Sequence, residues 1–238
     1  MDQTQKLLPR WFTIWFFASC LVFLIGGAIN KLAGVPDGDL NLWGAAIGVF
    51  AMYLLALFTW RRRETLRAFV AKISLPLVVK SVLIGWFFAE IDELVNFPFN
   101  PLFPGISLFQ DVIFTTPFYL LVHLGWFWVL RKYKFTVTEA LIVGGLTLGS
   151  FEIFGGGVNV LSILVVLVFP FVVMIHGVHM VMPKIGLARE LDNENQTDTK
   201  WKYVIGVLVP AAGGIIGIGL MFLLSFLLVS LGLMTPIV

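Results

Sequence analysis

The chain has 238 residues, of which 59% are hydrophobic and 13% charged, and its net charge is +2. Soluble domains are about half apolar and about one quarter charged, so this composition excludes an ordinary soluble domain and a disordered chain. One cysteine excludes an internal disulfide framework, and the small net charge excludes a nucleic-acid-binding module. The sequence therefore predicts an all-α, polytopic integral membrane protein, multi-pass in the cell membrane.

Seven apolar stretches are long enough to cross a bilayer. A membrane helix needs about 20 apolar residues, because at about 1.5 Å per residue that length spans about 30 Å of hydrocarbon. No stretch shows the two-residue alternation of a membrane barrel, and backbone groups in lipid must be satisfied within the segment, so helices are expected. The predicted spans are 11–32, 42–60, 73–95, 112–130, 137–154, 160–182 and 203–231. They predict one domain, 1–238, built as a bundle of seven transmembrane helices.

The basic residues predict the orientation. Fourteen of the 16 lysines and arginines fall before the first predicted span or after the second, fourth and sixth, and only Lys31 and Lys80 do not. Cytoplasmic loops carry the excess of Lys and Arg, so the N-terminus is expected in the cytoplasm and the C-terminus outside. The hydrophilic segment 184–202 is then a cytoplasmic linker, which we expect to be solvated.

Two sequence patterns predict helix starts, and a third predicts helix packing. Ser107 with Gln110, and Thr136 with Glu139, have the spacing of a capping box. Glycines four residues apart, at 145 and 149 and again at 213 and 217, are typical of faces along which membrane helices approach closely.

Five acidic side chains fall within or at the ends of predicted membrane spans, where an ionised group is costly in lipid. Four of them fall near the outer, C-terminal ends of predicted spans, where they oppose the helix dipole as well as the bilayer, and the fifth falls at the start of a span at the same depth. Such a set must bind a cation, hold protons or face water. The candidate catalytic residues are Glu90, Asp92, Glu93, Asp111 and Glu152.

The segment 96–110 is predicted to lie over these acids. Its prolines recur every three residues, which favours a stiff, extended backbone, and its phenylalanines argue against a free aqueous loop. We expect a lid suited to a lipid-like ligand, the alternative being an ordinary membrane-hugging loop. Its candidate substrate-binding residues are Asn96, Phe97, Phe99, Asn100 and Phe103.

A second polar group, made by Lys80 and three histidines, is predicted on the cytoplasmic half. His176 and His179 are three residues apart on one helix face, and with His123 they supply three potential ligands for zinc or iron. A histidine in a membrane helix is more often hydrogen-bonded to a neighbouring helix, and we expect this arrangement in preference to a metal. The sequence does not identify a cofactor, and the two alternatives are no cofactor and a divalent cation.

These features lead to three functional hypotheses. The first is a membrane-embedded enzyme for a lipid or isoprenoid substrate, in which the carboxylates under the lid do acid–base work. The second is a proton- or cation-coupled transporter that uses the same carboxylates. The third is a non-catalytic subunit of a larger membrane complex. The expected partners are membrane lipid, a lipid-like small molecule or cation, or another membrane protein, and no nucleic acid.

Overall fold

The computed structural model describes residues 7–34, 42–97, 107–155, 163–192 and 194–232. Within these ranges the chain is helical, apart from turns and one isolated bridge between Tyr133 and Thr197. The helices are α1 (Arg10–Leu32), α2 (Leu42–Arg61), α3 (Arg63–Ala71), α4 (Leu77–Asn96), α5 (Leu108–Lys132), α6 (Val137–Gly155), α7 (Ile163–Gly186), α8 (Ala188–Leu191) and α9 (Trp201–Ser230).

Each predicted span coincides with one of the seven longer helices. Four stretches of the described chain are long and apolar enough to cross a membrane: Arg10–Leu32, Leu108–Lys132, Phe169–Gly186 and Trp201–Ser230. Two further apolar helices, Ala46–Arg61 and Val137–Phe151, are shorter. These lengths and compositions suggest a membrane protein.

The helix starts follow from local chemistry. The Ser107 hydroxyl accepts from the Gln110 backbone N–H at 3.3 Å, and the Gln110 side chain accepts from the Ser107 N–H at 2.8 Å, so the predicted capping box is confirmed. Thr136 and Glu139 form the same pair of hydrogen bonds, at 3.2 and 2.7 Å. Helix α4 begins at Leu77 rather than at the predicted residue 73, because Pro76 disfavours helical backbone at the residue before it.

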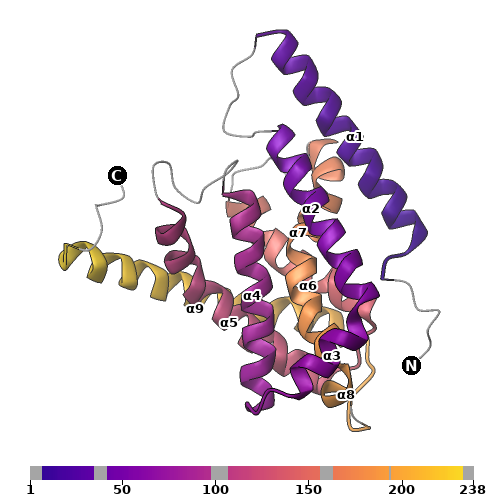
Figure 1. Cartoon of the computed structure of the whole chain (residues 1–238), viewed down its shortest axis with the longest axis vertical. Helices are drawn as coiled ribbons and strands as arrows, with labels where there is room; N and C mark the ends of the chain where they lie inside the picture. The colour runs from indigo at the N-terminus through magenta and orange to yellow at the C-terminus, as the bar shows by residue number, and fades with distance from the viewer. Residues whose placement is uncertain (1–6, 35–41, 98–106, 156–162, 193, 233–238) are drawn as a thin grey trace.

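Helices α4 to α7 form the centre of the molecule (Figure 1). Helix α7 runs through this centre and contacts α1, α2, α4 and α6. Helix α9 packs against α5 and α6 with its first half, and its last part extends away from the bundle (Figure 1).

Glycines allow the closest of these helix approaches. A Cβ atom on Gly145 would collide with the Val173 carbonyl oxygen of α7, and one on Gly213 would collide with the Leu121 carbonyl oxygen of α5. The predicted small-residue faces are therefore confirmed on α6 and α9. Close backbone approach gives a membrane bundle its dispersion contacts in the absence of a hydrophobic drive between helices.

Much of the segment 184–202 is packed rather than solvated, contrary to expectation. Leu187 and Leu191 are fully buried, and the Thr197 backbone bonds to the Lys132 carbonyl and the Lys134 N–H at 2.9 and 3.1 Å. The prediction was wrong because the polar residues of this segment outnumber two apolar residues, Leu187 and Leu191, that lie four positions apart.

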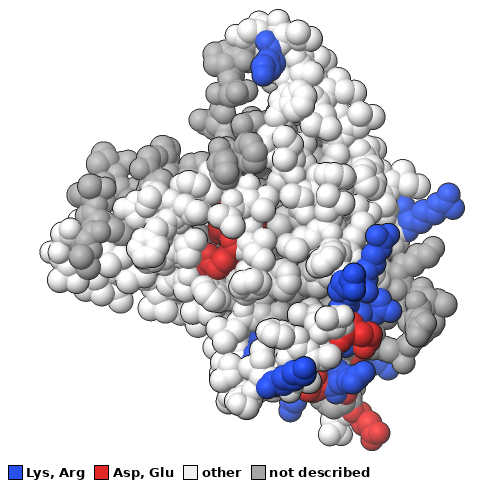
Figure 2. Space-filling view, in the orientation of Figure 1, with Lys and Arg blue, Asp and Glu red and all other residues white. Residues whose placement is uncertain are grey.

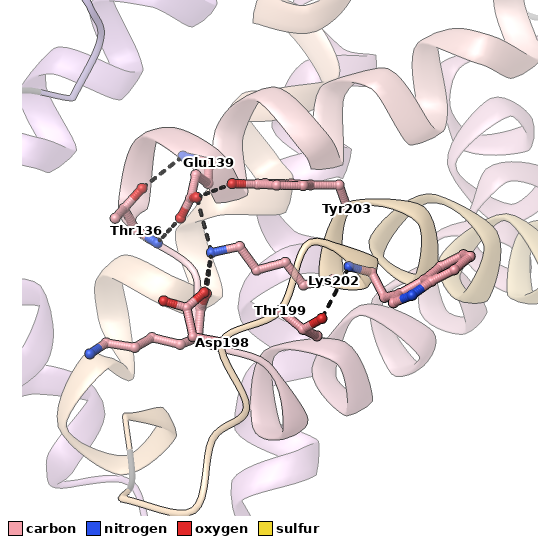
Figure 3. Close-up of polar contacts among 8 residues, drawn as sticks. Thr136, Glu139, Asp198, Thr199, Lys202 and Tyr203 are labelled. Carbon is pink, nitrogen blue, oxygen red and sulfur yellow. Dashed lines mark hydrogen bonds and ion pairs between the residues drawn. The ribbon is translucent and has the colours of Figure 1, made fainter.

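Lys202 ties the end of this segment to the start of α6 (Figure 3). Its ammonium group is buried and lies 3.0 Å from both the Glu139 and the Asp198 carboxylates, and it donates to the Lys134 carbonyl at 2.8 Å. The Tyr203 hydroxyl donates to Glu139 at 2.6 Å. Because a buried charge is costly unless it is paired and hydrogen-bonded, this network fixes where α9 begins against α6.

Charged side chains are distributed unevenly over the surface. Figure 2 shows most of the Lys and Arg at the lower end of the molecule, where α3 and α8 lie, and a broad uncharged face above it. A patch of acidic side chains interrupts that uncharged face beside α4 and α5 (Figure 2).

A substitution at Gly217 tests the packing of α9 on α5. A Cβ atom there would lie 2.5 Å from the Phe118 Cα and 3.0 Å from the Pro117 carbonyl oxygen, so Gly217→Ala forces two backbones apart. We expect a loss of about 1–3 kcal/mol in stability, measured by thermal unfolding in detergent. Gly219→Ala is the matched control, because no atom lies within 4 Å of its Cβ position. Equal stability of the two variants would contradict the proposed packing.

Candidate functional site: a buried carboxylate and histidine cluster

Three buried side chains from α4 and α7 converge in the centre of the bundle. One ligand atom of each of Asp92, His176 and His179 lies within 4.8 Å of the others. Their exposed fractions are 2%, 6% and 0%, so all three are withdrawn from the surface. His176 and His179 share a face of α7 because they are three residues apart. This set contains one carboxylate and two imidazoles, which are common ligands of zinc.

His123 of α5 adds the third histidine of the chain to this cluster. Its Nε2 lies 3.2 Å from His179 Nδ1, and the two rings meet edge to face with their centroids 5.3 Å apart. The predicted hydrogen bond to a neighbouring helix is therefore confirmed for this pair. A Cβ atom on Gly85 of α4 would collide with the His123 ring, so only glycine leaves room for the ring there.

Glu93 and His176 line a cavity of about 260 Å³. The Tyr119 hydroxyl donates to Glu93 Oε1 at 2.5 Å, which orients the carboxylate. The remaining walls come from α5, α6 and α9. They are Thr115, Phe118, Leu148, Phe151, Ile218 and Met221. The lining is thus mostly apolar and includes one carboxylate and one imidazole.

Glu90 belongs to a separate hydrogen-bonded set on the same two helices. The Thr116 hydroxyl lies 3.1 Å from Glu90 Oε1 and 2.7 Å from the Val112 carbonyl, and it accepts from the Trp86 indole N–H at 3.2 Å. Glu90 Oε2 is buried and has no hydrogen-bond partner among the described residues.

The other predicted site residues fall into two groups. Asp111 is fully buried in the first turn of α5, as expected for a carboxylate at the positive end of a helix. Asn96 ends α4 and is followed by the partly buried Phe97. Beyond the described part of the chain lie the side chains of Asn96 and Glu152 and the lid residues Phe99, Asn100 and Phe103.

The structure joins residues that the sequence analysis had placed in two groups. Asp92 was grouped with the outer acids and the histidines with the cytoplasmic half, yet Asp92 lies with His176 and His179. The third member of this set is therefore Asp92 rather than His123, because His123 instead bonds to His179.

Three contributing residues, Thr116, Tyr119 and Gly85, lie outside the set predicted from the sequence. Thr116 and Tyr119 precede the predicted His123 by seven and four residues, so the three share one face of α5, and this periodicity is visible in the sequence. Gly85 carried no such signal, because its role depends on the position of a ring on another helix.

Comparisons with known proteins give no further information about this site. No protein-family model, no curated protein and no solved structure matches the chain.

Removing the Tyr119 hydroxyl tests whether Glu93 depends on it. Tyr119→Phe leaves the partly buried Glu93 carboxyl group without this donor, and we expect a loss of about 1–3 kcal/mol in stability. Tyr53→Phe is the matched control, since Tyr53 is also buried but packs through its ring against Phe16 and Phe17. Thermal unfolding of both variants in detergent measures the difference. Unchanged stability of Tyr119→Phe would show that the hydrogen bond contributes nothing.

Proposed function

We propose that the protein is a membrane-embedded enzyme that acts on a lipid or isoprenoid substrate. The observation that carries this proposal is the cavity of about 260 Å³, lined mostly by apolar side chains and also by Glu93, Tyr119 and His176. An apolar chain fits the walls contributed by α5, α6 and α9, and a reactive polar group fits beside the carboxylate. Glu93 is then the candidate acid–base residue.

The volume of the cavity restricts the size of the substrate group that can bind in it. Small-molecule sites usually enclose about 300–1,000 Å³, and this cavity is just below that range. It therefore suits one segment of a single chain rather than a whole two-chain phospholipid. The rest of such a substrate stays in the surrounding bilayer, where it needs no protein contacts.

A proton- or cation-coupled transporter remains the alternative use of the same acids. Transport requires polar groups that continue from the cluster to the basic end of the bundle. The next buried side chains in that direction on α5 and α7 include Trp126, Val129, Met180 and Met182. The Trp126 indole N–H donates to the Met180 carbonyl at 2.6 Å, which ties the two helices together there. These side chains do not continue a polar path from the cluster toward the basic end. Their apolar character favours the enzyme over the transporter.

Glu93→Gln tests the enzymatic role directly. Purified wild-type protein and the variant are incubated with a total membrane-lipid extract, and the lipids are compared by mass spectrometry before and after. We expect the wild type to consume one lipid species and form another, and the variant to lose this conversion at least about 100-fold, the usual range for a missing acid or base. Gln keeps the volume and can still accept from Tyr119, so the fold should persist. A variant as active as the wild type would contradict the role of Glu93.

Two tryptophan substitutions on α9 test whether the substrate binds in the cavity, one as the test and one as its control. Ile218 lines the cavity, whereas Ile216 is 60% exposed on the same helix. Ile218→Trp should fill the space and abolish both the conversion and the retention of co-purified lipid, and Ile216→Trp should change neither. If lipid remains bound to both variants, the substrate binds elsewhere.

We also propose that all seven longer helices cross the cell membrane, with the N-terminus in the cytoplasm. The gathering of basic side chains at one end of the molecule supports this orientation (Figure 2). Tags at the N-terminus and within 184–202 should be protected from membrane-impermeant reagents in intact cells, and a C-terminal tag should be labelled. Labelling of a tag within 184–202 would reverse the orientation.

A further inference from the structure

We propose that Asp92, His176 and His179 bind one divalent transition-metal ion, for which zinc is the best match. The donor set has one carboxylate oxygen and two imidazole nitrogens, and three protein ligands of this kind are typical of catalytic zinc sites. Their ligand atoms lie within 4.8 Å of one another. Zinc bonds of about 2.0–2.2 Å place tetrahedral ligands roughly 3.3–3.6 Å apart, so small side-chain rotations close the set around the ion.

The convergence of the histidines supports a ligand rather than packing alone. The chain has three histidines, and all of them lie in this cluster although His123 and His179 are 56 residues apart. The ring centroids of His176 and His179 are 5.8 Å apart, and those of His123 and His179 are 5.3 Å apart. Apolar side chains would fill the same space without the cost of burying polar nitrogens.

The second nitrogen of His179 points to the same conclusion. His179 Nε2 is buried and has no hydrogen-bond partner among the described residues. When His179 Nδ1 donates to His123 Nε2, the His179 Nε2 atom carries a lone pair. A cation beside Asp92 stabilises this tautomer, because it supplies the missing partner of that lone pair.

His123 is then a positioning residue that acts through His179. Metal-binding histidines usually donate their other N–H to an acceptor that fixes tautomer and ring orientation, and here the acceptor is His123 Nε2 at 3.2 Å. Gly85 allows this position of His123, because the imidazole ring lies directly against the α4 backbone where the Cβ atom of any other residue would be.

If the protein is the lipid enzyme proposed above, the metal specifies its reaction as hydrolysis of a lipid ester or amide. This assignment of the reaction rests on the proposed function. Three ligands leave a position for water, and His176 borders the cavity. An ion held by these three residues would activate a water molecule for attack on the carbonyl carbon, and Glu93 would accept the proton of that water. The same proton would pass to the leaving oxygen or nitrogen as its bond to the carbonyl carbon breaks.

The test is the metal content of purified protein from cells grown with added zinc. We expect about one equivalent per chain in the wild type by elemental mass spectrometry, and less than about one tenth in Asp92→Asn and His179→Asn. Glu90→Gln is the matched control, because it removes a buried carboxylate of the same helix outside the set, and it should keep the full equivalent.

A further measurement on the wild-type protein makes the test independent of variants that fail to fold. Chelator-treated wild-type protein titrated with Co²⁺ should develop the visible absorption of a four-coordinate site at one equivalent. His123→Leu should weaken this binding about 10–100-fold, whereas His123→Gln, whose amide oxygen still accepts from His179, should recover most of it. Gly85→Ala should weaken binding as well, and Gly219→Ala should not.

Wild-type protein without bound zinc and without a Co²⁺ spectrum would overturn the metal site. A full equivalent of metal in the Asp92→Asn, His179→Asn double variant would overturn the assignment of the ligands. Stoichiometric metal in a protein that converts no lipid would instead support the site and contradict the proposed function, so the two failures are distinguishable.

Discussion

A polar side chain buried in an apolar helical bundle must find its partner within the protein. Lipid tails offer neither donors nor acceptors, and an unpaired group in such surroundings costs several kcal/mol. In this molecule the requirement falls on α4, α5 and α7, which together bury carboxylates, hydroxyls and all three imidazoles. The pairs Tyr119–Glu93 and His123–His179 each join two different helices, so the same contacts that satisfy the polar groups also determine how these helices are placed.

Close backbone approach makes this arrangement geometrically possible. Gly85 allows the His123 ring to lie against α4, and Gly145 brings α6 onto α7 next to the stretch that carries His176. At the charged end, Lys202 fixes the start of α9 against α6, and α9 then supplies Ile218 and Met221 to the cavity. Contacts far from the cluster therefore shape the space beside it.

The proposed enzyme and the proposed metal rest on different observations. The enzyme rests on a largely apolar cavity lined by Glu93, and the metal rests on the proximity of Asp92 to two histidines and on His179 Nε2, which has no hydrogen-bond partner among the described residues. His176 belongs to both sets, so it would link a bound ion to the cavity. A metal at this position supplies a partner for the buried His179 Nε2, which neither a transporter nor a passive subunit requires.

The helices are predictable from the amino-acid sequence, because apolar length and capping chemistry are local properties. The long apolar helices, the two capping boxes and the close-approach glycines of α6 and α9 all follow from spacing along the chain. The same local reasoning separates the candidate polar residues into two groups by their predicted depth. Only the tertiary structure placed Asp92 beside His176 and His179, since the rotation and offset of one helix against another depend on packing contacts that no single helix encodes. The packed segment after α7 and the role of Gly85 were decided in the same way, by side chains that approach from elsewhere in the chain.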